Sequence, residues 1–133
     1  MTARVVFNRY PVAQWNNAKR EMKSALISAV KEPRLLSYKQ VRNKIAAIPL
    51  EDEAFFPGSE AFSRMQGEVS TEEHKAGRGM LTAFMVNALT HMPGDGFFTL
   101  AQKLGYTSQN RLAIWSRMLA KVSDAWTKQH RKQ

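Results

Sequence analysis

The sequence predicts a compact, mainly α domain with a small β element at most. Apolar residues recur at intervals of three and four over long segments, and capping boxes that begin with serine precede two of these segments. Glycine or proline follows where the segments end. Because 133 residues suffice for one hydrophobic core, we expect residues 1–133 to form a single domain.

The first long segment predicts a helix over residues 12–31, after a short strand at residues 5–7. Trp15 and Met22 belong to the apolar stripe of this helix, so we expect both in the core. Pro33 ends the helix, because proline has no amide hydrogen to continue the hydrogen-bond ladder.

Further helices are predicted in the next part of the chain. Ser37 and Gln40 form a capping box that opens a second helix, and Pro49 follows the end of that helix. After an acidic loop that contains residues 51–53, Ser59 is expected to cap a third, short helix.

The middle of the chain has a less uniform pattern. Ser70 and Glu73 form a second capping box, which predicts a separate brief helix that Gly77 ends. Residues 80–88 have the apolar density of a buried strand, but a buried helix has the same density, so periodicity leaves both open.

The last part of the chain predicts two helices joined at a glycine. Residues 97–104 form the first, which follows a turn at residues 91–96 and ends at Gly105. The second runs from residue 107 or 108 to about residue 130, with a frayed basic tail at residues 126–133. Its expected buried stripe consists of Leu112, Trp115, Leu119, Val122 and Trp126.

Charge is unevenly distributed along the chain. The net charge is +9, and residues 1–50 and 101–133 carry the positive excess, whereas residues 51–100 are net acidic. If the fold brings the basic parts together, they form a positive face for DNA or RNA. The same charge would suit an acidic protein partner, an anionic lipid or simple solubility. The side chains expected to contact phosphates are Lys19, Lys23, Lys39, Arg42, Arg117, Lys121 and Lys128.

Composition excludes several classes of function. The chain has no cysteine, which excludes disulfides, thiolate catalysis and cysteine-bound zinc and fits a reducing cytoplasm, where we expect the protein. No apolar run is long enough to span a membrane, and the first residues do not read as a signal peptide. Because neither a phosphate-binding glycine loop nor a metal-binding spacing is present, we expect no cofactor and no metal.

Residues 97–115, FFTLAQKLGYTSQNRLAIW, resemble a helix-turn-helix DNA-binding unit. Ala101 stands where two helices approach closely, and Gly105 stands at the turn. The buried positions of such a unit match Leu100, Leu104 and Ile114. The resemblance implies a recognition helix whose first side chains read base edges in the major groove. Those side chains are Gln109, Asn110 and Arg111.

Two segments, SYKQVRNKIA and AGRGMLTAFMVNALTHMPGDGFF, look like the winged-helix domain of DNA alkyltransferases and alkyltransferase-like proteins. The proline-cysteine-histidine-arginine motif that carries alkyl transfer in that family has no counterpart in this sequence. The resemblance therefore implies DNA binding alone. The same stretch is similar to small uncharacterised bacterial proteins, which implies no activity.

An accessory or regulatory subunit of a larger complex is an alternative function. Exposed phenylalanines beside the acidic loop would then anchor a protein partner. The simpler interpretation places them in the core, because a chain of this length needs most of its aromatic residues inside. The phenylalanines concerned are Phe55, Phe56, Phe97 and Phe98.

A metal-independent, nuclease-like toxin is the third alternative. His74 or His91 would act with Lys75 or Arg78 as acid, base and phosphate anchor. Two surface histidines are the simpler interpretation, and we predict no catalytic residue. The sequence thus favours a nucleic-acid-binding protein that performs no reaction and uses basic helices on the phosphate backbone.

Overall fold

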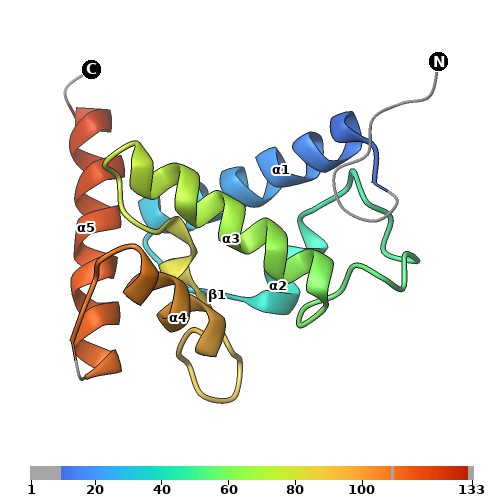
Figure 1. Ribbon diagram of the computed structural model, residues 1–133. Helices are drawn as coiled ribbons and strands as arrows, with labels where there is room; N and C mark the ends of the chain where they lie inside the picture. The colour runs from blue at the N-terminus through green and yellow to red at the C-terminus, as the bar shows by residue number, and fades with distance from the viewer. Residues whose placement is uncertain (1–9, 109, 132–133) are drawn as a thin grey trace.

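The computed structural model describes residues 10–108 and 110–131 and is mainly helical with a small β element, as the sequence predicts (Figure 1). The predicted strand at residues 5–7 lies outside the described residues. No helix in the described part of the chain is long and apolar enough to cross a membrane. In chain order the elements are α1 (Val12–Lys31), β1 (Leu36–Ser37), α2 (Tyr38–Asn43), α3 (Glu60–Lys75), the 3₁₀ helix η1 (Leu81–Phe84), β2 (Met85–Val86), α4 (Asp95–Lys103) and α5 (Arg111–Arg131).

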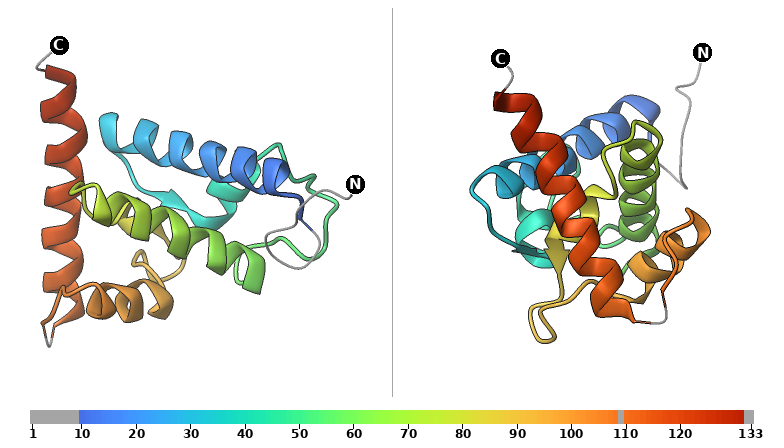
Figure 2. Two further views of the ribbon diagram at one scale, coloured as in Figure 1. Left: turned by 45° about the horizontal axis from the view of Figure 1, so that its top comes forward. Right: turned by 90° about the vertical axis from the view of Figure 1, so that its left-hand side faces the viewer.

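The helices are arranged around a buried central segment. α1 and α3 lie side by side, α4 lies beneath α3, and α5 crosses the ends of these helices (Figures 1 and 2). The 3₁₀ helix η1 is buried along its whole length and contacts α1, α3 and α5. These three long helices therefore share one core through η1.

The β element is a two-stranded parallel sheet in which Leu36 pairs with Met85 and Ser37 with Val86. It joins the segment before α2 to the segment after η1. The apolar run at residues 80–88 is therefore neither one strand nor one helix, because η1 and β2 divide it. Every residue of both elements is buried, which explains the apolar density.

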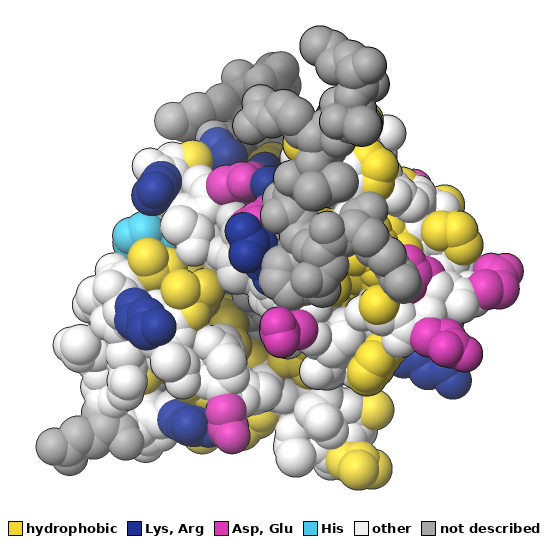
Figure 3. All heavy atoms as spheres, turned by 45° about the vertical axis from the view of Figure 1, so that its right-hand side comes forward, with side chains coloured by type: hydrophobic (Ala, Val, Ile, Leu, Met, Phe, Trp, Pro, Cys, Tyr) yellow, Lys and Arg dark blue, Asp and Glu magenta, His cyan; other side chains and the backbone are white. Residues whose placement is uncertain are grey.

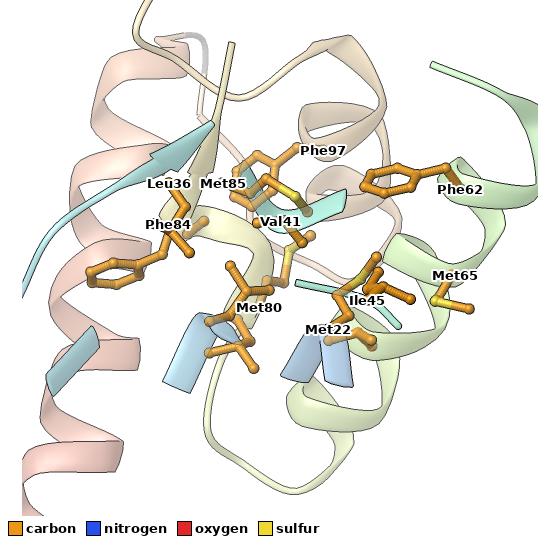
Figure 4. Packing of buried hydrophobic residues seen from close by; sticks show 14 of the residues in the cluster. Met22, Leu36, Val41, Ile45, Phe62, Met65, Met80, Phe84, Met85 and Phe97 are labelled. Carbon is orange, nitrogen blue, oxygen red and sulfur yellow. The ribbon is translucent and has the colours of Figure 1, made fainter. Parts of the chain in front are cut away.

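The hydrophobic core receives side chains from all five α-helices. Trp15 and Met22 are buried, as predicted. Several core residues are methionines, whose unbranched side chains fill irregular gaps. Figure 4 shows side chains from α1, α2, α3, α4 and the η1 region that meet in the core: Met22, Val41, Phe62, Met65, Met80, Phe84, Met85 and Phe97.

A buried ion cluster fixes α3 to its neighbours. Glu73 has no solvent exposure, accepts hydrogen bonds from Arg78 at 2.9 and 2.8 Å, and pairs with Lys23 of α1 at 3.1 Å. The Arg78 guanidinium also lies over the Trp126 ring of α5, 5.2 Å from its centroid. Burial alone would raise the pKa of Glu73, but the hydrogen bonds from Arg78 and Lys23 outweigh burial and lower it.

The predictions for α1 and for the start of α2 are confirmed. α1 ends at Lys31, and the Ser37 capping box forms in both directions with Gln40. α2 is shorter than predicted and ends at Asn43, well before Pro49. The chain leaves the helix there and brings the buried residues Ile45 and Ile48 into the core.

The prediction of a separate helix at residues 70–77 is wrong. α3 is continuous through this segment, and the Ser59 hydroxyl caps its first turn, as predicted. Ser70 is buried inside α3, where its hydroxyl bonds to that of Thr82 in η1. A capping box and an interior helix turn have the same sequence spacing, so only the packing distinguishes them.

The last two helices form as predicted, but the inward face of α5 is rotated. Gly105 follows α4 with a φ of +100°, the left-handed conformation expected of a glycine helix end. α5 continues through much of the predicted tail, to Arg131. Leu112 is 56% exposed, and Trp115, Leu119 and Trp126 are only partly buried. Among the α5 side chains that the structure describes, the buried ones are Ile114, Met118 and Val122.

Candidate nucleic-acid interface

The lysines of α1 that were expected to contact phosphates are paired with carboxylates. Lys19 contacts Glu68 at 3.2 Å and Glu72 at 2.6 Å, and Lys23 contacts the buried Glu73. All three carboxylates belong to α3. The positive charge of these lysines therefore joins α1 to α3 and is locally neutralised.

Arg42 lies inside the protein, contrary to its predicted place on a basic surface. It is 4% exposed and donates four hydrogen bonds of 2.8–3.2 Å to backbone carbonyls of the irregular segment that follows α2. The acceptors are the carbonyls of Ile45, Ile48, Pro49 and Phe55. The guanidinium thus stabilises the segment after α2 rather than a surface contact. The position of Arg42 on the basic side of α2 gives no sign of this role.

Arg117 and Lys121, in contrast, lie together at the surface. They are exposed, stand four residues apart on α5, and line a hollow of about 410 Å³ together with Tyr106 and Thr107. We name this hollow, which Gly105, Ile114 and Met118 complete, the α5 hollow. Two cationic and two hydroxyl-bearing side chains surround it, and no carboxylate of the described residues lines it.

Two contacts fix the walls of the α5 hollow. The Tyr106 hydroxyl lies 2.7 Å from Nδ1 of His74, and the two rings meet edge to face with centroids 5.2 Å apart. On the α5 side, a Cβ atom at Gly79 would lie 3.2 Å from the Lys121 stem and from Val122. Gly79 therefore lets the stem of Lys121 lie close to the backbone while the residue stays exposed.

Other exposed lysines have no ion-pair or hydrogen-bond partner among the described residues. Lys75 follows His74 at the end of α3, and Lys103 is the last residue of α4, just before the segment that lines the α5 hollow. Lys39 lies in the first turn of α2. Lys44 lines a different hollow, between α1 and the segment after α2. These four lysines all lie at or near helix ends.

The side chains predicted to read bases lie at the start of α5. Gln109 is outside the described residues. Asn110 caps α5, since its side-chain oxygen accepts a backbone amide hydrogen bond at 2.9 Å in the first turn. Arg111 is exposed, pairs with Asp95 at 2.6 Å and lies over the Phe98 ring at 4.8 Å. The Arg111 contacts join the start of α5 to α4.

The unit formed by α4 and α5 has the apolar pattern on which the helix-turn-helix resemblance rests. Residues 104–110 connect the two helices, a longer connection than the three or four residues usual in such units. Two of the expected positions, Ala101 and Ile114, are buried, and two others, Leu100 and Leu104, are partly buried.

Positive charge is dispersed over the face of the molecule that Figure 3 shows, where Lys and Arg side chains stand among neutral and hydrophobic ones, with acidic side chains between them. Lys128 belongs to α5, seven residues after Lys121, a spacing that keeps both positions on one helix face. The Lys128 side chain lies outside the described residues. Such a dispersed pattern suits an extended polyanion better than a compact anion.

The residues of the two alternative functions are also placed. Phe55, Phe97 and Phe98 are buried in the core, and Phe56 is 52% exposed. His91 lies in an exposed turn with a φ of 60°. Within the described residues, no group of three or more potential metal ligands comes together.

Comparisons of this chain with protein-family models, with curated proteins and with solved structures found no match. The assignment of function therefore rests on the chemistry and geometry of the site.

Proposed function

We propose that this protein binds nucleic acid, DNA or RNA, through phosphate contacts at the α5 hollow, and that it performs no reaction there. The observation that carries the proposal is the presence of Arg117 and Lys121 beside two hydroxyl-bearing side chains, with no neutralising carboxylate among the described lining residues. Arginine offers forked donors that match phosphate oxygens, and lysine adds a compact positive charge.

Tyr106 supports this role as a hydrogen-bond donor. Burial raises the pKa of Tyr106, so its hydroxyl is neutral at physiological pH. When Nδ1 of His74 carries the proton, it donates to the Tyr106 oxygen and leaves the phenolic hydrogen for a phosphate. Lys75, which follows His74, adds a further positive charge nearby.

A longer nucleic acid would extend beyond the α5 hollow. Lys103 at the end of α4 and Lys128 on α5 are candidates for further phosphate contacts. Asn110 and Arg111 lie at the start of α5, where a helix-turn-helix arrangement would place base contacts. Reading a base would require Arg111 to leave Asp95. The cysteine-free composition accords with work in the reducing cytoplasm.

The double variant Arg117→Gln/Lys121→Gln tests the site. We expect its affinity for labelled duplex DNA or structured RNA, measured by fluorescence anisotropy at about 50 mM salt, to fall about tenfold or more. The matched control is Arg20→Gln/Lys44→Gln, which removes the same two types of charge from the hollow beside α1. Equal losses in the two double variants would reject the site, and no binding by the wild type would reject the function.

A further inference from the structure

Side chains of α3 and α4 line a groove of about 890 Å³. Ser63, Gln66 and Gly67 belong to its α3 wall. Its α4 wall contains Gly96 and Lys103. Tyr38 of α2, Phe97 of α4 and the turn after β2 also line it. We name it the α3–α4 groove.

Each wall of the groove carries a glycine that the fold itself does not require. A Cβ atom at Gly67 or at Gly96 would have nothing within 4 Å, and neither residue has a positive φ. Glycine within a helix is less stabilising than alanine, so both positions weaken their helices. Gly96 shares one face of α4 with Leu100 and Lys103, which also line the groove. The two glycines keep the groove wide.

The charge of the α3–α4 groove is of one sign. Lys39 and Lys103 are the charged residues among the described lining residues, and both are exposed without a partner in the described part of the chain. Apolar side chains also line the groove, including Leu89, which is 90% exposed. Hydroxyl and amide side chains, such as Thr99 and Asn87, complete the lining. The occupant should therefore combine negative charge with flat apolar groups and polar edges.

We propose that the α3–α4 groove holds a single-stranded segment of nucleic acid, with its bases in the groove and its phosphates at Lys39 and Lys103. This inference rests on the proposed function. Bases of a single strand expose their apolar faces and their polar edges, whereas those of a duplex are stacked and paired. Lys103 lies two residues before Gly105 of the α5 hollow in the sequence, and we expect one strand to extend from the groove toward Arg117.

The variant Gly96→Leu tests the groove without removing a charge. Leucine has a higher helix propensity than glycine and finds open space at this position, so the melting temperature should not fall. The control Ala13→Leu adds the same side chain at an exposed position of α1. The probes are a thymidine oligonucleotide of about 12 residues and a duplex of the same length.

We expect the wild type to prefer the single strand, and Gly96→Leu to weaken single-strand binding about tenfold or more while duplex binding changes less than about threefold. Equal binding of both probes, or no effect of Gly96→Leu, would reject the groove and leave the phosphate contacts at Arg117 and Lys121 intact. Binding of neither probe by the wild type would reject the proposed function as well. Binding of an acidic peptide that Gly96→Leu weakens, without binding of the oligonucleotide, would assign the groove to a protein partner.

Discussion

The guanidinium of Arg42 bonds to four carbonyls in a segment that has no helix or strand to satisfy them. The variant Arg42→Met keeps the apolar stem and leaves these carbonyls without their donors. Because buried acceptors without partners are costly, we expect the free energy of unfolding, measured in urea, to fall by about 3 kcal/mol or more. The control Lys39→Met, at an exposed position of the same helix, should change it by less than about 0.5 kcal/mol. A comparable small loss for Arg42→Met would contradict the role of the guanidinium.

Glu73 makes stability depend on pH. Its pKa in the folded protein is lowered from the ordinary value of 4.5, so its ionised form stabilises the fold above that value. This stabilisation is lost as the pH falls through the lowered pKa. The variant Glu73→Gln cannot titrate at this position. We therefore expect the wild type to be more stable near neutral pH, and the difference in unfolding free energy to shrink as the pH is lowered from about 6 to about 3. A difference that is constant over this range would show that the pKa of Glu73 is the same in the folded and unfolded states, contrary to its lowering by Arg78 and Lys23.

At the scale of elements, α5 is held by a narrow buried stripe. Met118 is 2% exposed, whereas Leu112 on the same helix is 56% exposed. We expect Met118→Ala to lower the free energy of unfolding by about 2–5 kcal/mol. Leu112→Ala should change it by less than about 0.5 kcal/mol. Chemical denaturation followed by circular dichroism measures both, and the reverse order would mean that α5 packs through a different face.

Local signals predict the elements that depend on local contacts. Pro33 and the Ser37 capping box mark the end of α1 and the start of α2, because each acts within a few residues. The continuity of α3 and the rotation of α5 depend on distant partners, such as the bond between Ser70 and Thr82. These partners are set by the tertiary packing, which sequence periodicity does not contain.

The residues of the candidate site are likewise predictable only where a local pattern indicates them. Charge and helical spacing indicate Arg117 and Lys121, which the structure places together at the α5 hollow. The same spacing predicts a surface phosphate contact for Arg42, although Arg42 is buried and bonds to carbonyls of a later loop. Tyr106 has no sequence signal, because its contact with His74 joins residues 32 positions apart.

At the scale of the whole molecule, the net charge differs from the charge that is free to bind a phosphate. The chain carries +9, but several cations form ion pairs within the protein, such as Lys19 with Glu72 and Arg78 with Glu73. The proposed function depends on the cations that remain unpaired at the α5 hollow, rather than on the total. Net charge alone would give every exposed lysine or arginine a similar effect on affinity.

The dependence of affinity on salt separates these two accounts. Each phosphate contact on B-DNA contributes about −0.9 to the slope of log affinity against log salt concentration. We predict that Arg117→Gln/Lys121→Gln makes the duplex slope shallower by about 1.8, while Arg20→Gln/Lys44→Gln leaves it close to that of the wild type. Equal slopes for the two double variants, or no wild-type binding at about 50 mM salt, would contradict the claim that the α5 hollow contacts phosphates.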